Sequence, residues 1–190
     1  KIRDSADILQ PGKEETYQFI EKLLSSVKEN FSTNRVHLGM DEAVMLGLGN
    51  YLKENGYKKG SLIIREHCNR VVDICRKLEL KPMIWSDMYI TANSTGGYYD
   101  LPENTDCSKW EKPKKDLGLV YWDYYHDDTR TYEKMLDIHA QLSDNVIFAG
   151  GSWIWNGISP NYSKTYACTK AALSTCKKYN IKEVLCTAWM

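Results

Sequence analysis

Residues 36–42 read VHLGMDE, a short apolar run that ends in two adjacent acids. Side chains alternate along an extended chain, so this run has one apolar face and one mixed face. The apolar face carries Val36, Leu38 and Met40, and the other face carries His37, Gly39 and Asp41. Because burying polar side chains costs free energy, a strand that turns histidine and aspartate inward is typical of a functional site. The run therefore predicts a buried strand whose last residues open a site.

The pattern of a short apolar run followed by a helical stretch recurs along the chain. Further strands are predicted at residues 82–85, 119–124, 146–150 and 184–189. Apolar residues at helical spacing predict helices at residues 61–79, 131–142 and 163–179. They also predict a first helix through residues 20–31, preceded by Pro11 and Gly12 and with Glu14 and Glu15 on its first turn. Strands that alternate with helices in this way are typical of βα units, in which helices cover a parallel sheet.

Two architectures fit such units, a doubly wound open sheet and a (β/α)8 barrel. A nucleotide-binding open sheet needs a glycine-rich turn after its first strand, and Gly96-Gly97 and Gly150-Gly151 lack the rest of that fingerprint. Polar and aromatic residues instead follow all the predicted strands, which is where barrel enzymes build their sites. A whole barrel has about 250 residues and eight strands. We therefore expect an α/β fold, with residues 1–190 forming the later part of a TIM barrel, about strands 4 to 8, as one partial catalytic domain.

The charge balance argues against two classes of partner. Lysine and arginine number 25, and aspartate and glutamate also number 25, so no net field attracts nucleic acid or a membrane surface. The chain has 6 Trp and 13 Tyr against 3 Phe, a bias that suits stacking on a ligand as well as core packing. Helical spacing of Cys68 with Cys75 and of Cys168 with Cys176 favours buried thiols over disulfides or metal ligands. Free thiols and the lack of a signal peptide indicate a cytoplasmic rather than a secreted protein.

Residues 37–43, HLGMDEA, resemble the His-x-Gly-x-Asp-Glu-Ala signature of family 20 glycoside hydrolases, the β-N-acetylhexosaminidases. In that family the signature closes the fourth strand of the barrel, which agrees with the strand count above. Residues 46–49, LGLG, resemble a subgroup of small bacterial enzymes of the family. Taken alone, Asp41 and Glu42 would also fit a pair of acids that caps the following helix.

The resemblance implies hydrolysis of terminal, non-reducing β-linked N-acetylglucosamine or N-acetylgalactosamine with retention of configuration. In the family's substrate-assisted route the sugar's own 2-acetamido oxygen is the nucleophile. Glu42 would be the general acid and then the general base, and Asp41 would hold the acetamido N–H. The partner is then an amino-sugar oligosaccharide or glycoconjugate, and no metal or other cofactor is implied.

Tryptophans at predicted strand ends are the expected walls of the sugar site. The resemblance implies this role for Trp85, Trp122 and Trp189, with core packing as the alternative, and Trp153 and Trp155 could contribute. Tyr124 shares the strand parity of Trp122, and either Tyr124 or Tyr125 could bind the acetamido oxygen. Asp87 fits a ligand of a sugar hydroxyl or a helix cap equally well. His37 fits a structural histidine bonded to its neighbours better than a catalytic base, and residues 86–117 are expected to form a loop that covers the substrate.

Two family features cannot be located in the sequence. These are the sugar-binding arginine of the first strand and the acid that follows the last tryptophan, since the chain ends at Met190. Two rival functions therefore stay open: a carbohydrate-binding pseudo-enzyme that kept the aromatic pocket, and a barrel hydrolase that acts on other sugars. The sequence does not decide the oligomeric state.

Overall fold

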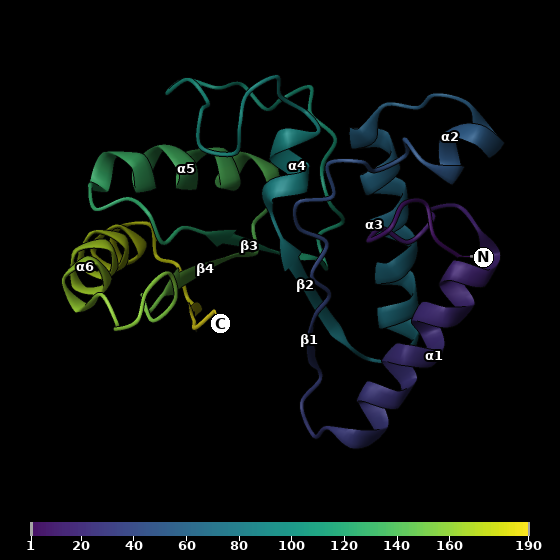
Figure 1. The fold of residues 1–190 in the computed structure, drawn as a ribbon, viewed down its shortest axis with the longest axis horizontal. Helices are drawn as coiled ribbons and strands as arrows, with labels where there is room; N and C mark the ends of the chain where they lie inside the picture. The colour runs from purple at the N-terminus through teal and green to yellow at the C-terminus, as the bar shows by residue number, and fades with distance from the viewer. Residues whose placement is uncertain (1, 190) are drawn as a thin grey trace. The chain divides into compact units, whose positions relative to one another are not determined.

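The computed structural model describes residues 2–189, in which helices alternate with parallel strands (Figure 1). The helices are α1 (Glu14–Asn30), α2 (Asn50–Asn55), α3 (Gly60–Lys77), α4 (Asp87–Thr91), α5 (Thr129–Leu142) and α6 (Tyr162–Lys178). The strands are β1 (Arg35–His37), β2 (Lys81–Trp85), β3 (Gly118–Trp122), β4 (Val146–Gly151) and β5 (Val184–Thr187). The chain forms two compact units, one of residues up to Leu101 with Lys109–Gly118, and one of Pro102–Ser108 with residues from Leu119 onward.

In the first unit β1 and β2 are parallel, with Arg35 opposite Lys81 and His37 opposite Met83. Helices α1 and α3 pack against each other beside these strands (Figure 1). Their buried core consists of Tyr17, Ile20, Leu24, Val71, Ile74, Cys75 and Leu80. The predicted apolar face of the first strand, Val36, Leu38 and Met40, packs against this core. The alternation read from VHLGMDE is therefore confirmed.

A buried aspartate fixes the segment that follows the acid pair. Asp4 is 3% exposed, and its two carboxylate oxygens accept hydrogen bonds from the backbone N–H groups of Gly47 and Tyr51, each at 2.7 Å. A Cβ atom at Gly49 would lie 2.0 Å from the Asp4 carbonyl oxygen, so only glycine allows this close approach. The glycines of LGLG therefore have a packing reason that the sequence pattern did not supply.

In the second unit β3, β4 and β5 are parallel, with Leu119 opposite Val146 and Phe148 opposite Val184. Helices α5 and α6 pack together, and α6 also contacts β4 (Figure 1). The Tyr121 ring lies 4.8 Å from the ring of His139 on α5 and 5.4 Å from the Phe148 ring. Since Tyr121 faces the helices, its neighbour Trp122 faces the opposite side of the sheet.

The strands and the four long helices occur where the sequence predicts them, but β3 and β5 each end two residues before the predicted bound, and two other kinds of difference are found. Strand β1 ends at His37 rather than at residue 40, because Gly39 and Met40 adopt positive φ angles of 71° that a strand cannot continue. Short helices α2 and α4 were not predicted, and α4 lies inside the stretch 86–117 that was expected to be an irregular loop. Four of the five residues of α4 are buried, so this helix has no amphipathic period to detect. The four helix cysteines are buried free thiols, as their spacing predicts.

Candidate active site

The acid pair lies on a turn of unusual backbone conformation directly after β1. The Leu38 N–H donates to the Met83 carbonyl oxygen at 2.8 Å, and the Trp85 N–H donates to the Gly39 carbonyl oxygen at 3.1 Å. The backbone then leaves the sheet with positive φ angles at Gly39 and Met40 (71° each) and at Glu42 (48°). Positive φ is disfavoured for residues with side chains, and such conformations persist where the surrounding structure holds them, often at functional sites.

The Asp87 carboxyl group anchors the backbone of this turn. Its Oδ2 atom accepts a hydrogen bond from the backbone N–H of Glu42 at 2.8 Å, although the two residues are 45 positions apart. Asp87 is only 3% exposed and is the first residue of α4, directly beyond β2. The side chains of Asp41 and Glu42 are both exposed. A buried carboxylate thus fixes the backbone of the second acid while both acidic groups stay accessible.

His37 and Trp85 lie side by side next to the acid turn, with ring centroids 4.4 Å apart. The His37 Nδ1 atom accepts a hydrogen bond from the Gly39 N–H at 3.0 Å. Burial lowers the pKa of His37, which favours the neutral ring. Because Nδ1 accepts a hydrogen bond, the proton of the neutral ring lies on Nε2, a buried atom with no hydrogen-bond partner among the described residues. These contacts agree with the expectation of an interior histidine bonded to its neighbours.

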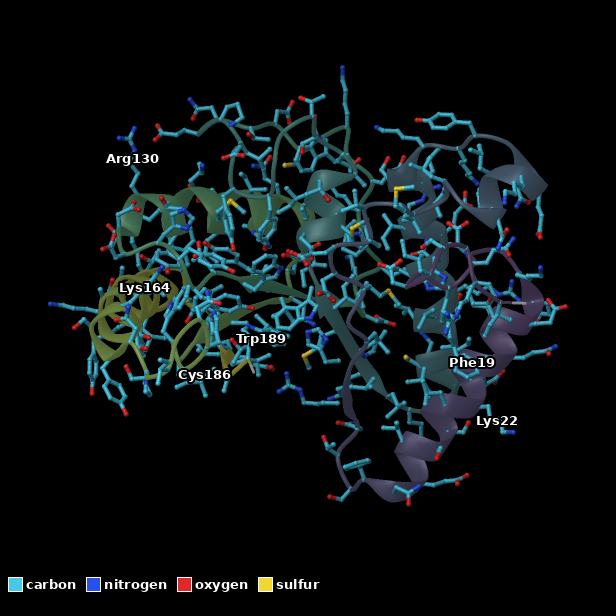
Figure 2. The ribbon with its side chains drawn as sticks, in the orientation of Figure 1. Phe19, Lys22, Arg130, Lys164, Cys186 and Trp189 are labelled. Atoms are coloured by element: carbon cyan, nitrogen blue, oxygen red, sulfur yellow. The ribbon has the colours of Figure 1, made fainter. Side chains whose placement is uncertain are left out.

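Four aromatic rings of the second unit form what we call the aromatic cluster: Trp122, Tyr124, Trp155 and Trp189. Tyr124 is central, with its ring 5.7 Å from Trp122 in a stacked arrangement and 5.7 Å from Trp155 in an edge-on arrangement. Trp189, labelled in Figure 2, lies 6.3 Å from Tyr124 and is 44% exposed. The stacking of Trp122 on Tyr124 confirms that the two residues share one face. Three predicted site residues are therefore brought together, and Trp155 joins them.

Trp153 and Tyr125 occupy supporting and outer positions. Trp153 is 6% exposed, and its indole N–H donates to the Tyr124 carbonyl oxygen at 2.6 Å. Its ring stacks on Trp155 at 4.7 Å, and the half-exposed Tyr125 ring meets it edge-on at 5.6 Å. Trp153 thus braces both the backbone and the rings of the aromatic cluster. Sugar contacts by Trp153 or Tyr125 stay predictions.

Asp123 is a functional candidate that the sequence reading missed. It is 1% exposed and accepts hydrogen bonds from the Tyr125 N–H at 2.9 Å and the Tyr121 hydroxyl at 3.0 Å. Its Oδ2 atom also lies 2.8 Å from Nδ1 of His126, and this hydrogen bond raises the pKa of His126. These bonds shape the turn that carries Tyr124. The sequence feature that could have indicated Asp123 is its position as an acid at the end of a predicted buried strand, within WDYYH at residues 122–126.

Gly151 is a second residue whose role only the structure reveals. A Cβ atom at this position would lie 2.7 Å from Trp155 and 2.9 Å from the Tyr124 ring. These separations are too short for real contacts, so only glycine lets the two rings approach β4 this closely. From the sequence alone, Gly150-Gly151 indicated only that the glycine fingerprint of a nucleotide-binding turn is incomplete.

Residues 2–189 contain no group of three or more histidine, cysteine, aspartate or glutamate side chains arranged to hold a metal ion. None of the described helices has the length and apolar character needed to cross a bilayer.

Parallel βα repeats with an acid pair after one strand and aromatic rings after others are typical of a barrel protein that builds its site at the carboxyl ends of its strands. Residues 1–142 match the description "Glycosyl hydrolase family 20, catalytic domain", and the chain belongs to this family. The family and the fold class expected from the sequence are both confirmed: an α/β protein that comprises part of a (β/α)8 barrel.

Solved structures of the same family resemble the chain at low sequence identity. A β-N-acetylhexosaminidase from Bacteroides fragilis NCTC 9343 matches with a TM-score of 0.50 and 16% identity over 84% of this chain and 29% of its own. An enzyme from Streptomyces coelicolor A3(2) matches with a TM-score of 0.45 and 13% identity over 74% and 22%. A catalytic module of a pneumococcal exo-β-D-N-acetylglucosaminidase matches with a TM-score of 0.45 and 17% identity over 100% and 43%. The chain thus spans less than half the length of each of these proteins, and no curated protein sequence matches it.

Proposed function

We propose that the protein is a retaining, substrate-assisted hydrolase that removes terminal, non-reducing β-linked N-acetylglucosamine or N-acetylgalactosamine. The observation that carries this proposal is the acid turn, in which the buried Asp87 carboxylate holds the backbone N–H of Glu42 at 2.8 Å. Three residues of the turn have positive φ angles, and a binding protein has no evident need for such a constrained pair of exposed acids. Membership of family 20 supports hydrolysis of a glycosidic bond.

Adjacent carboxylates suit a mechanism in which the substrate provides the nucleophile. Most retaining glycosidases use two carboxyl groups about 5 Å apart on opposite sides of the sugar, an arrangement that neighbouring residues reach poorly. We infer that the acetamido carbonyl oxygen attacks the anomeric carbon while protonated Glu42 donates its proton to the leaving oxygen. The Asp41 carboxylate accepts a hydrogen bond from the acetamido N–H and stabilises the positive charge that develops there.

The second half of the reaction uses the same residues. Glu42, now ionised, takes a proton from water, whose oxygen attacks the anomeric carbon and displaces the acetamido oxygen. Two successive inversions at one carbon restore the original configuration. The aromatic residues at strand ends, Trp85, Trp122, Tyr124 and Trp189, are proposed to contact the faces and the acetamido methyl group of the sugar.

The test is hydrolysis of 4-nitrophenyl N-acetyl-β-glucosaminide by the full-length protein, with and without N-acetylglucosamine thiazoline, a mimic of the cyclised intermediate. Turnover that the thiazoline blocks supports both the substrate class and the acetamido nucleophile. Binding of the thiazoline without turnover would instead identify a carbohydrate-binding pseudo-enzyme, and faster cleavage of the matching glucoside would identify a hydrolase for other sugars.

A pair of matched variants tests the role of Glu42. We expect Glu42→Gln to lose turnover of unactivated disaccharides by about a hundredfold or more, because general acid catalysis contributes factors of about 10² to 10⁴. Glu29→Gln, which changes an exposed acid on α1, serves as the control and should keep full activity. Normal activity of Glu42→Gln on such substrates would refute the general-acid assignment.

A further inference from the structure

A cavity of about 500 Å³ opens beside the first turn of α6, and we call it the α6 pocket. Its lining includes Trp153, Trp155, Asn156, Asn161, Ser163 and Lys164. All these residues belong to the second unit, as does the aromatic cluster. The pocket therefore combines indole rings, neutral hydrogen-bonding side chains and one cation.

Trp155 connects the α6 pocket to the aromatic cluster. Its ring stacks on buried Trp153 at 4.7 Å and meets Tyr124 edge-on at 5.7 Å, while Trp155 itself is only partly buried. A single indole thus borders both the cluster and the pocket. Trp155 would therefore be a shared wall for a terminal sugar at the cluster and for a sugar bound in the pocket.

Lys164 supplies the only charge of the pocket lining, which contains no aspartate or glutamate. Its ammonium nitrogen lies 3.8 Å from the centre of the Trp153 ring and 5.7 Å from that of Tyr125, and Figure 2 labels the residue at the start of α6. No described carboxylate forms an ion pair with Lys164. The backbone N–H of Lys164 also donates to the Asn161 side chain at 3.0 Å, which fixes this turn of the helix.

An ammonium group that is held over an indole still has N–H donors on the side away from the ring, and these can bind a ligand. An anion offers these donors stronger, charge-assisted hydrogen bonds than a hydroxyl group does. A solvated surface lysine would lack the indole contact and the adjoining aromatic wall.

We propose that the α6 pocket binds the aglycone sugar next to the scissile bond and that Lys164 makes it selective for a sugar carrying an anionic group, either a carboxylate or a sulfate ester. This inference rests on the proposed function for the identity of the terminal sugar. The contribution of Lys164 to anion binding is nevertheless measurable without turnover.

The binding test titrates the full-length protein with galactose, galactose 6-sulfate and glucuronic acid in a calorimeter. We expect at least one anionic sugar to bind about fivefold more tightly than galactose, the effect of one partly exposed ion pair. Lys164→Met keeps an apolar stem on the Trp153 ring and should abolish the difference, whereas Lys164→Arg should preserve it. Lys170→Met, which changes an exposed lysine further along α6, is the matched control.

The kinetic test compares disaccharides in which β-linked N-acetylglucosamine is attached to galactose, to galactose 6-sulfate or to glucuronic acid. A higher kcat/KM for a disaccharide with an anionic aglycone supports the proposal if this preference is lost in Lys164→Met but kept in Lys170→Met. Comparing the galactose 6-sulfate and glucuronic acid disaccharides shows whether a sulfate or a carboxylate is preferred. Equal binding of all three sugars, or a preference that survives Lys164→Met, overturns it. Selective binding of an anionic sugar with no turnover of any glycoside would support anion binding by the α6 pocket and would contradict the proposed function.

Discussion

If Glu42 is the general acid proposed above, its anchoring by Asp87 predicts how activity changes when the Asp87 carboxyl group is removed. In the Asp87→Ala variant the backbone N–H of Glu42 loses its part-buried hydrogen bond of 2.8 Å to the Asp87 carboxyl group. Such a bond to a charged group contributes about 1.5 to 3 kcal/mol. Since about 1.4 kcal/mol corresponds to a factor of ten, loss of the acid's position should lower kcat/KM by about ten- to a hundredfold. Asp87→Asn keeps an acceptor oxygen without the charge, so its loss should be smaller, about fivefold.

The assay compares two aryl N-acetyl-β-glucosaminides that differ in leaving group. A 2,4-dinitrophenyl group leaves with little help from an acid, whereas a 4-methoxyphenyl group needs protonation. If Asp87 acts by positioning Glu42, the Asp87 variants should lose activity mainly on the 4-methoxyphenyl substrate. Asp144→Ala, a change at an exposed acid, is the control.

An equal loss on both substrates would refute this reasoning. It would favour the other function considered for Asp87, a direct contact with a sugar hydroxyl, because such a contact is independent of the leaving group. A urea unfolding curve for each variant separates both effects from simple loss of the folded state.

Three further predictions concern the second unit. Gly151→Ala should raise KM several-fold with little change in secondary structure, because its Cβ would lie 2.7 Å from Trp155; unchanged steady-state kinetics would contradict this. The pKa of His126 is raised by its bond to Asp123, so its stabilising contribution is complete below pH 6.5 and is lost as the pH rises through the raised pKa. Melting temperatures should therefore fall more over that range in the parent protein than in His126→Gln, and parallel curves would disprove the contribution. Burial lowers the pKa of His139 from 6.5 to about 4, so the free energy of unfolding should drop by roughly 3 kcal/mol as the pH falls between those values. His139→Phe should flatten this part of the pH profile in urea titrations, and an equally steep profile would count against the assignment.

Much of the fold could be predicted because the period of the apolar residues reports which faces are buried. Val36, Leu38 and Met40 pack against the helix core on the face that alternation predicted, although only residues up to His37 form strand β1. The four long helices lie within two residues of most predicted bounds. Helix α4 escaped prediction because nearly all its side chains are buried, which removes the contrast between faces. Strand β1 was predicted too long because positive φ at Met40 follows from contacts that sequence periodicity does not report.

The sequence by itself indicated the family, through the resemblance of HLGMDEA to the family signature, and it predicted Asp41 and Glu42 as the acid pair. The signature and the strand period of VHLGM are properties of neighbouring residues, so no tertiary contact is needed to detect them. Only the tertiary structure decided how these acids and the aromatic rings are held. The bond from Glu42 to Asp87 spans 45 positions, and that from Trp153 to Tyr124 spans 29. Such partners depend on how whole βα units pack together. The local sequence around a residue does not indicate which distant carboxylate or carbonyl group will lie within hydrogen-bonding distance of it.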